Sequence, residues 1–319
     1  MVDTGSKSTW VRCKSCTKGC KSDDPPYDPS KSSTYTNNTR PCNGSFRVVY
    51  GDKSSISGAW GCDSFTGDDH DLGVIMKFRF VCAQEIDGDF GDAYGVLGLG
   101  RGESSVTSQI GSAIQMFSYY IPPTSSSVGN LYFGNEAREK SNACSNQFTP
   151  LVKGPDPYYY VDLVGISVAG KKLDVSSTIF TSRGTIIDTG TTITRLPEEV
   201  YSALRDAFRQ SMSRQSSCTL IEEKVNKLMD TCYRLEGYNQ QLVLPDIKFH
   251  FGKASTIDVT LSIKGTVWTP HDSNTSIMCL AFASTEKVTI IGNVQQRGLN
   301  VIYDLEGQRI GFGTKCLTS

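Results

Sequence analysis

Asp3-Thr4-Gly5-Ser6 stands near the start of the sequence, and Asp188-Thr189-Gly190-Thr191 repeats it beyond the middle. Each stretch is an acid, a hydroxyl residue, a glycine and a second hydroxyl residue, and each follows apolar residues. Two apolar residues and a glycine follow each copy at a similar distance, as Val96-Leu97-Gly98 and Ile290-Ile291-Gly292. This double repeat predicts two related halves, each of which contributes one carboxylate to a shared site.

Paired carboxylates have a specific chemical use. Two carboxyl groups about 3 Å apart share one proton, because like charges at that distance cannot both ionise cheaply. The ionised member can take a proton from water while the protonated member polarises a carbonyl, and the pair titrates as one unit. One Asp-Thr-Gly alone is more often a simple turn. The second copy makes Asp3 and Asp188 an acid pair in our interpretation.

Other catalytic patterns are weaker in this sequence. The histidines are His70, His250 and His271, and no Gly-x-Ser-x-Gly motif accompanies them, so nothing favours a Ser-His-Asp enzyme. The glycine-rich stretch at 98–102 lacks the Gly-Lys-Ser/Thr ending of a phosphate-binding loop. We therefore read that stretch as a strand followed by a turn.

Length and pattern predict two all-β halves. The chain has 319 residues, enough for two domains with a core each. Short Val, Ile, Tyr and Phe runs alternate with turn residues, which favours strands. Gly154, Pro155 and Pro157 mark the junction, so we place the N-terminal lobe at 1–152 and the C-terminal lobe at 153–319.

Individual elements can also be predicted. A helix is expected over 198–212, where apolar residues recur every four positions after Pro197. A hairpin tip is expected at 51–55. Strands are expected at 46–50, 73–81, 130–133, 158–168, 184–187, 242–251, 257–263, 278–282, 289–291, 299–303 and 309–312.

Charge and cysteine content point to the environment of the protein. The net charge of −1 gives no electrostatic reason to expect nucleic acid or a charged membrane surface. No apolar run approaches the roughly 18 residues that span a bilayer. Eleven cysteines suggest an oxidising compartment and disulfides. Glycosylation candidates are the sequons at Asn37, Asn43 and Asn274.

Cys13-x-x-Cys16 allows two interpretations. It could belong to a zinc site or a redox pair, but no second ligand pair stands at a fitting distance. A loop closed by disulfides agrees better with the other cysteines.

The two copies differ in what precedes them. A strand-like approach to the second copy begins at Tyr158, whereas only Met1 and Val2 precede Asp3. If the halves are equivalent, the first lacks its leading strands, together with any signal or pro-segment. We therefore expect this sequence to be part of a longer protein.

Many stretches in the same order resemble one family, the pepsin-like aspartic proteases, and within it the plant nepenthesin-like group, which includes chloroplast nucleoid DNA-binding-like proteases. Besides both acid motifs, the matching stretches are Trp10-Val11-Arg12-Cys13, Asp28-Pro29-Ser30-Lys31-Ser32-Ser33-Thr34-Tyr35, Tyr50-Gly51-Asp52-Lys53-Ser54, residues 95–102, Phe117-Ser118-Tyr119, Thr194-Arg195-Leu196-Pro197, Asp230-Thr231-Cys232-Tyr233, Cys279-Leu280-Ala281-Phe282 and Ile291-Gly292-Asn293-Val294-Gln295-Gln296.

This resemblance implies a bilobal all-β fold with a few short helices and a cleft between the lobes. Asp3 and Asp188, one from each lobe, would activate a water that attacks a peptide carbonyl at acid pH, without metal, cofactor or covalent intermediate. The resemblance also implies roles for the neighbouring residues. Thr4 and Thr189 would bridge the two loops beside Gly5 and Gly190, Ser6 and Thr191 would hydrogen-bond the acids, and Tyr50 would sit on a flap with Gly51 and Asp52, supported by Trp10.

The resemblance further implies a Cys232–Cys279 disulfide, with Cys13 and Cys82 as additional disulfide candidates. Lys53 stands where many relatives have glycine, so flap mobility or substrate choice should differ. Tyr120 stands where close relatives have cysteine, and Cys316 is our candidate for the odd cysteine.

The implied partners are polypeptide substrates of a monomeric enzyme, with no nucleic acid and no membrane span. The implied location is the secretory pathway, leading to the apoplast or a vacuole, with a plastid as an alternative. A competing interpretation is a binding protein, because some members of this superfamily act as inhibitors or stores. Both acids, both glycines and Tyr50 are present, which favours catalysis. DNA binding is suggested only by the name of some relatives.

Overall fold

The computed structural model describes residues 1–20, 24–67, 73–91, 93–111, 115–124, 126–222, 225, 228–235, 242–252, 257–269 and 276–314. The chain divides into two compact units, Met1–Ile114 with Pro155–Tyr159, and Gln115–Gly154 with Tyr160–Ser319. Strands dominate both units, which confirms the all-β prediction. The segment 115–154 packs with the second unit, where β7 and β9 pair with strands near the C-terminus. The lobe boundary at residue 152 stays a prediction.

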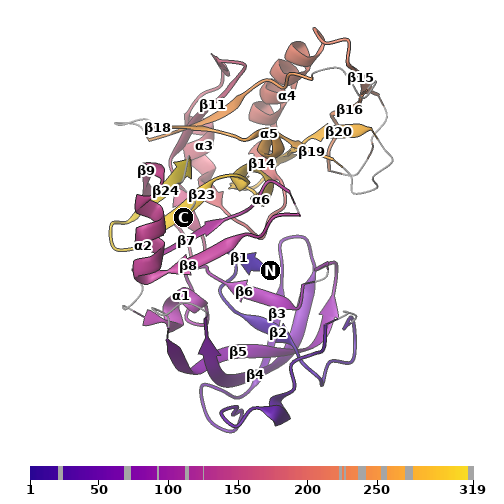
Figure 1. The fold of residues 1–319 in the computed structure, drawn as a ribbon. Coiled ribbons are helices and arrows are strands. Elements are labelled where there is room, and N and C mark those ends of the chain that lie inside the picture. The colour runs from indigo at the N-terminus through magenta and orange to yellow at the C-terminus, as the bar shows by residue number, and fades with distance from the viewer. Residues whose placement is uncertain are drawn as a thin grey trace. The chain divides into compact units, whose positions relative to one another are not determined.

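The first unit is built on one six-stranded sheet (Figure 1). Its strand order is β1 (Val2–Asp3), β6 (Gly95–Gly98), β2 (Trp10–Arg12), β5 (Val74–Asp87), β4 (Ser55–Thr66) and β3 (Ser45–Val49). Short helices η1 (Pro29–Lys31) and α1 (Val106–Gln109) accompany the sheet. Its central core gathers residues that alternate along the strands, among them Trp10, Ile56 and Val81.

The second unit contains three sheets. The ten-stranded sheet has the order β21 (Phe282–Thr285), β14 (Thr194–Pro197), β22 (Thr289–Ile291), β13 (Thr185–Ile187), β10 (Tyr159–Val161), β9 (Ser145–Val152), β24 (Arg309–Thr314), β23 (Asn300–Asp304), β7 (Met116–Tyr120) and β8 (Asn130–Phe133). The two four-stranded sheets are β12 (Lys171–Lys172), β11 (Leu163–Val168), β17 (Ile247–Phe251), β18 (Ile257–Thr260), and β15 (Cys218–Ile221), β16 (Cys232–Leu235), β20 (Ile277–Leu280), β19 (Val267–Trp268).

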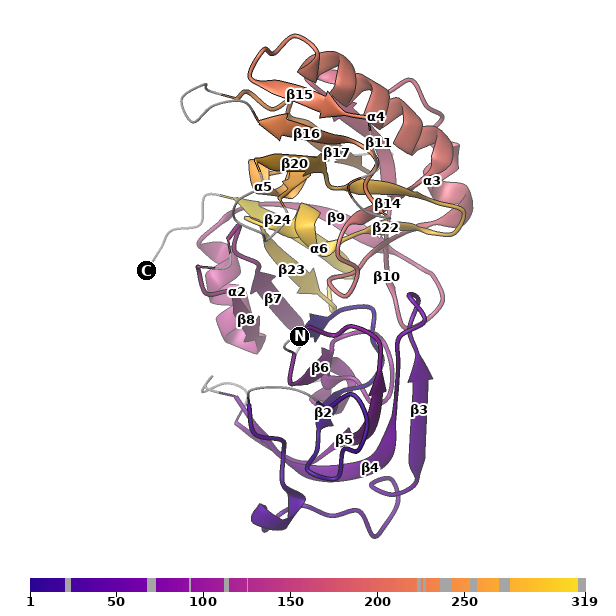
Figure 2. The ribbon, with the colours of Figure 1, turned by 90° about the vertical axis from the view of Figure 1, so that its right-hand side faces the viewer.

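Helices α2 (Gly134–Asn142), α3 (Thr178–Arg183), α4 (Glu198–Met212), α5 (Ile263–Thr266) and α6 (Asn293–Gln296) pack on these sheets. Helix α4 has the predicted bounds and packs against β11, β14 and β21. Figure 2 shows it beside β11 and β14. Its buried residues include Val200, Leu204 and Phe208, the apolar stripe read from the sequence. An amphipathic helix of this kind is held mainly by the face that it buries.

Most predicted strands lie within one or two residues of observed ones, and two of the exceptions have local causes. The strand expected over 242–251 begins only at Ile247, since Pro245 cannot donate to a sheet ladder. The strand expected over 257–263 ends at Thr260, because the Ser262 side chain caps α5 by accepting from the Gly265 N–H.

Disulfides join Cys13 to Cys82, Cys16 to Cys20, Cys42 to Cys62, and Cys232 to Cys279. The first of these connects Cys13, which directly follows β2, to Cys82 within the neighbouring strand β5. The last connects opposed residues of β16 and β20. Cys13 and Cys16 bond to different cysteines, so the C-x-x-C motif is not a redox pair. Cys316 lies outside the described residues.

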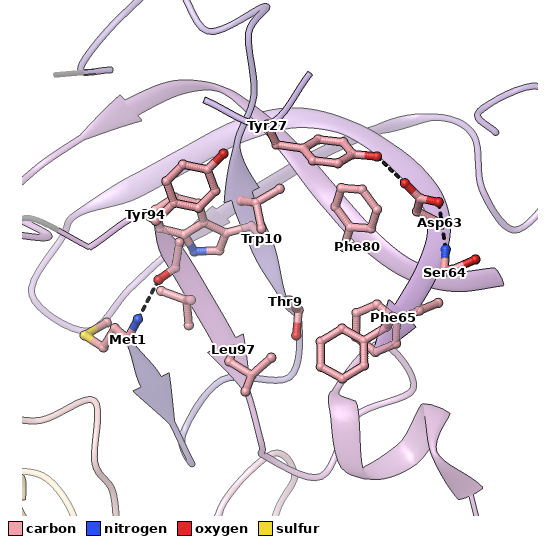
Figure 3. A pocket seen from close by; sticks show the side chains of 14 residues that line it. Met1, Thr9, Trp10, Tyr27, Asp63, Ser64, Phe65, Phe80, Tyr94 and Leu97 are labelled. Atoms are coloured by element: carbon pink, nitrogen blue, oxygen red, sulfur yellow. Dashed lines mark hydrogen bonds between the residues drawn. The ribbon is translucent and has the colours of Figure 1, made fainter. Parts of the chain in front are cut away.

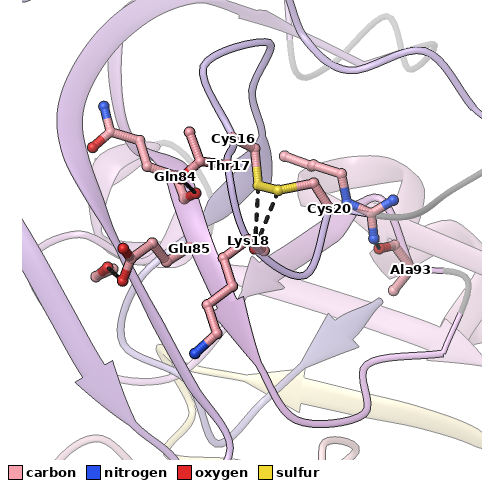
Figure 4. Close-up of a disulfide and its surroundings, with 9 residues drawn as sticks. Cys16, Thr17, Lys18, Cys20, Gln84, Glu85 and Ala93 are labelled. Atoms are coloured by element: carbon pink, nitrogen blue, oxygen red, sulfur yellow. Dashed lines mark hydrogen bonds between the residues drawn. A yellow bond between two sulfur atoms is a disulfide. The ribbon is translucent and has the colours of Figure 1, made fainter.

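The Cys16–Cys20 disulfide closes a short loop against β5 (Figure 4). The Thr17 N–H donates to the Gln84 carbonyl at 2.8 Å, and the Lys18 carbonyl accepts from the β5 backbone at 2.9 Å. The loop is therefore attached to the first unit both covalently and through the main chain.

Candidate active site

The first acid loop follows β1 in the first unit. Asp3 is 5% exposed, and its carboxylate accepts two hydrogen bonds from its own loop. The Gly5 N–H donates to Oδ1 at 2.8 Å, and the Ser6 hydroxyl donates to Oδ2 at 2.5 Å. The Ser6 carbonyl in turn accepts from the Gly100 N–H at 2.9 Å. Both carboxylate oxygens are thereby held in one orientation, and bonds of this kind to an ionised group are the stronger ones.

The second acid loop follows β13 in the second unit and has the same geometry. Asp188 is 8% exposed. The Gly190 N–H donates to Oδ1 at 2.9 Å, and the Thr191 hydroxyl donates to Oδ2 at 2.7 Å. The Thr191 carbonyl accepts from the Asn293 N–H at 2.7 Å. The repeat in the sequence is therefore a repeat of one hydrogen-bonded loop.

The apolar-apolar-glycine patterns form the strands beside the acids. β1 runs parallel to β6, with Asp3 opposite Gly98. β13 runs parallel to β22, with Ile187 opposite Ile291, and the Asp188 N–H donates to the Ile291 carbonyl at 3.0 Å. Each aspartate thus leaves a strand whose parallel neighbour is formed by residues about a hundred positions away in the chain.

Gly98 and Gly292 are required by close approach of the main chain. A Cβ on Gly98 would lie 2.6 Å from the Ser8 carbonyl oxygen. A Cβ on Gly292 would lie 2.6 Å from the Ile193 carbonyl carbon. Neither glycine has a positive φ, so the need is for space.

The remaining loop residues are placed within their own units. Thr4 is fully buried and Thr189 is 5% exposed. Gly5 is half-buried and Gly190 is exposed. The bridge between loops that the resemblance assigned to the two threonines stays a prediction.

The predicted flap is the tip of the β3–β4 hairpin. The Tyr50 N–H donates to the Ser54 carbonyl at 2.8 Å, and the Lys53 N–H donates to the Tyr50 carbonyl at 3.0 Å. The Asp52 carboxylate accepts from the N–H and the hydroxyl of Ser54, at 2.9 and 2.6 Å, while Gly51 is exposed. Lys53 has φ of 75°, the left-handed region that favours glycine. Glycine would adopt this backbone conformation without strain.

An aromatic cluster anchors the flap in the first unit. Trp10 is 1% exposed, and its Nε1–H donates to the Tyr50 hydroxyl at 2.9 Å. Phe90 packs edge-on against both rings, with centroids 5.2 Å from Trp10 and 5.6 Å from Tyr50. Burial raises the pKa of Tyr50 to about 12; the bond from Trp10 opposes this rise and the charge of Asp3 adds to it. The Tyr50 hydroxyl therefore stays protonated and lies within electrostatic reach of Asp3.

Phe90 is a site residue that sequence reasoning missed. It lies outside any strand, in a loop before β6, and no periodicity marks it. Only the three-dimensional contact with Trp10 and Tyr50 identifies it.

Gln295 and Gln296 were also missed as individual residues, although they were quoted in the resemblance. Both are 1% exposed. The Gln296 amide donates to the carbonyls of Ile291 and Gly292 at 3.1 Å each and accepts from the Tyr119 hydroxyl. A buried amide needs several hydrogen-bond partners, and only the folded structure shows where these two find them.

The first unit also holds an apolar cavity of about 330 Å³ (Figure 3). Its walls are mainly aromatic rings and include Trp10, Tyr27, Phe65, Phe78, Phe80 and Tyr94. Asp63 lies at its wall and accepts a hydrogen bond from Tyr27. Neither Asp3 nor Tyr50 lines the cavity, so we do not include it in the candidate active site.

One histidine forms a Ser-His-Asp network. His250 Nε2 lies 2.6 Å from the Ser167 hydroxyl, and Nδ1 lies 2.6 Å from Asp258 Oδ1. Ser167 is 6% exposed in β11, which is paired on both edges, so its neighbouring N–H groups are committed to the ladders. A nucleophilic serine needs free N–H donors for the oxyanion. We read this network as structural. His70 and His271 lie outside the described residues.

Two of the three glycosylation candidates, Asn37 and Asn43, are exposed. Asn274 lies outside the described residues. Across the described part of the chain, no helix has the length and apolar character needed to cross a membrane.

Two family models match the sequence. Residues 36–135 match the model described as xylanase inhibitor N-terminal, and residues 158–314 match the model described as xylanase inhibitor C-terminal.

Individual relatives are named as proteases. The chain is 36% identical to aspartyl protease AED1 of Arabidopsis thaliana, over 98% of this chain and 67% of the relative. It is 31% identical to ASPARTIC PROTEASE IN GUARD CELL 2 of the same plant, over 98% and 68%. It is 28% identical to aspartic proteinase nepenthesin-2 of Nepenthes gracilis, over 99% and 74%. The chain spans about two thirds to three quarters of the length of these relatives. The sequence identity, the coverage and the two acid loops together show that this chain belongs to the plant aspartic proteases of the pepsin-like family.

Proposed function

We propose that this protein is an aspartic endopeptidase in which Asp3 and Asp188 together activate a water molecule that attacks a peptide carbonyl. The observation that carries the proposal is the duplicated loop: each carboxylate accepts one glycine N–H on Oδ1 and one hydroxyl on Oδ2. Two acids with matching supports are suited to share one proton, and family membership supplies the reaction class.

The proposed reaction needs one proton on the pair. The ionised carboxylate takes a proton from water as the oxygen attacks the peptide carbonyl, and the protonated carboxyl donates a hydrogen bond to the carbonyl oxygen. The pair then returns a proton to the leaving nitrogen. Since both carboxyls ionise as the pH rises, cleavage is expected to have an acid optimum.

The flap supplies the cover for this site in our proposal. Tyr50 is held by Trp10 and packed on Phe90, so its ring is positioned before substrate binds. Gly51 and Asp52 at the exposed tip would lie against an extended peptide. A cover of this kind excludes water from the reacting bond.

Substrates are proposed to be unfolded or extended polypeptides, cut by a monomer. The proposed location is the secretory pathway. The described disulfides support this location, because such bonds persist in oxidising compartments. Thr4 and Thr189 are proposed to tie the two acid loops together.

The test is cleavage of an acid-denatured protein, such as haemoglobin or casein, in acidic and neutral buffers. Asp3→Asn and Asp188→Asn should each abolish cleavage, and pepstatin should block the unaltered protein. Asp174→Asn, at an exposed acid in the second unit, is the matched control and should cleave normally. An Asp188→Asn variant that still cuts, in a pepstatin-insensitive protein, would refute the assignment.

A second candidate is an inhibitor-type binding protein, which the names of the matching family models favour. The same preparation separates the candidates. Stoichiometric inhibition of a xylanase by a preparation that cleaves no polypeptide would support the binding function, whereas pepstatin-sensitive cleavage would support the protease.

A further inference from the structure

One hydrogen bond beside the aspartates occurs in both units. The Gly98 N–H donates to the Thr9 hydroxyl at 3.1 Å, and the Gly292 N–H donates to the Thr194 hydroxyl at 3.1 Å. Thr9 and Thr194 stand at the same distance along the chain from Asp3 and Asp188. The acid stretches thus read Asp-Thr-Gly-Ser-Lys-Ser-Thr and Asp-Thr-Gly-Thr-Thr-Ile-Thr, and the shared final threonine is a third echo in the sequence.

These hydroxyls accept hydrogen bonds from N–H donors that lie in the interior. Thr9 is 4% exposed and Thr194 is fully buried. The glycine N–H groups belong to strand ends that approach the acid loop too closely for any side chain. A buried N–H without an acceptor is strongly unfavourable. The close approach of each glycine segment to its acid loop, which we call the crossing, leaves the glycine N–H buried. The threonine hydroxyl supplies the acceptor that this N–H needs.

The crossing also sets the position of the acids. Gly98 lies directly opposite Asp3 in the parallel register, and Gly292 directly follows Ile291, which accepts the Asp188 N–H. A shift of either glycine segment would move the carboxylate beside it. The backbone of both threonines is also held, because the Thr9 carbonyl accepts from the Val81 N–H at 2.9 Å and the Thr194 N–H donates to the Gln295 side chain at 2.8 Å.

We propose that Thr9 and Thr194 are positioning residues for catalysis: each hydroxyl holds the glycine segment that fixes the orientation of its aspartate. They act through the main chain and touch no substrate. This inference rests on the proposed peptidase function.

The experiment compares Thr9→Val and Thr194→Val with the unaltered protein, because valine keeps the shape and removes the hydroxyl. Each variant should lower kcat about tenfold, the effect of losing one buried hydrogen bond, with KM within twofold. The acid and basic limbs of the kcat profile should shift, since both report the acid pair. Thr9→Ser and Thr194→Ser should restore kcat to within about threefold, because serine keeps the acceptor.

Thr149→Val is the matched control. Thr149 is 2% exposed, and its hydroxyl has no hydrogen-bond partner among the described residues. This variant should keep the kcat and the pH profile of the unaltered protein. It measures the effect of replacing a buried threonine by valine when no hydrogen bond is lost.

The outcomes separate this proposal from the function on which it rests. An unaltered protein that cuts no polypeptide refutes the proposed function. Valine variants that lose thermal stability yet keep kcat and the pH profile refute only the positioning role. Should the valine variants fail to fold, amide hydrogen exchange on the unaltered protein decides: Gly98 and Gly292 must exchange far more slowly than exposed Gly51, and equal rates would overturn the proposal.

Discussion

In Gly98→Ala or Gly292→Ala, the new methyl group would collide with main-chain atoms of the neighbouring aspartate loop. On Gly98 the new carbon would lie 2.6 Å from the Ser8 carbonyl oxygen and 2.8 Å from that of Ser6. On Gly292 it would lie 2.9 Å from the Thr191 carbonyl oxygen. Ser6 and Thr191 are the residues whose hydroxyls bind the aspartates.

The magnitude follows from these distances. Relaxed non-bonded carbon contacts lie at about 3.5–4.0 Å, so main-chain atoms must move by roughly 1 Å. Overpacking of a well-packed interior costs about 1–3 kcal/mol, and we take the upper value of about 3 kcal/mol because main-chain atoms cannot rotate away. In domains of roughly 150–250 residues, a loss of 1 kcal/mol lowers the thermal unfolding midpoint by about 2–4 °C. The midpoint of each variant should therefore fall by about 6–12 °C.

The assay is thermal unfolding followed by circular dichroism, together with kcat at a temperature where the variant is folded. Gly51→Ala is the control, because a Cβ there meets nothing within 4 Å and Gly51 has no positive φ. The control should unfold within about 1–2 °C of the unaltered protein. Alanine variants at Gly98 and Gly292 should lose kcat at least tenfold, since the loop that carries the carboxylate is displaced. Variants with unaltered midpoint and kcat would refute the idea that these glycines are needed for space.

Three further changes test the flap and the first unit. Trp10→Phe removes the hydrogen-bond donor to the Tyr50 hydroxyl and should lower kcat/KM by up to about tenfold. The measurement is cleavage of a fluorescence-quenched peptide, and an unchanged kcat/KM would mean that this bond does not order the flap. Lys53→Gly removes a side chain from a residue in the left-handed region and should raise the free energy of unfolding by about 1 kcal/mol. Urea titration measures this change, and a lower free energy of unfolding would contradict the strain argument. Asp63→Asn tests a pKa: burial raises the pKa of Asp63, but its hydrogen bonds, chiefly from Thr34 and Tyr27, outweigh burial and lower it. Because the folded pKa lies below the unfolded value near 3.9, the carboxylate stabilises the protein fully above about pH 4, and this contribution is lost as the pH falls through the folded pKa. The stability gap between the unaltered protein and Asp63→Asn should therefore shrink on acidification, and a gap that grows would contradict the direction of the shift.

Local requirements were readable from the residues alone. The two acid motifs were visible because a tight loop around a carboxylate needs glycine and hydroxyls next to it in the chain. Helix α4 had its predicted bounds because its apolar period and Pro197 lie within one continuous segment. The apolar-apolar-glycine patterns were recognised as repeats, but their pairing with the acid strands was not, since parallel pairing joins residues far apart in the chain.

The amino-acid sequence by itself determined that this protein carries two equivalent acid loops in an all-β chain of the aspartic protease type. Only the tertiary structure decided which distant residues support those loops: Phe90 behind the flap, Gln296 beneath the second acid, and Thr9 and Thr194 on the glycine amides. The physical reason is the range of the interactions. Turn and helix preferences act between neighbours along the chain, whereas a buried amide or aromatic ring finds its partners only when separate segments pack together.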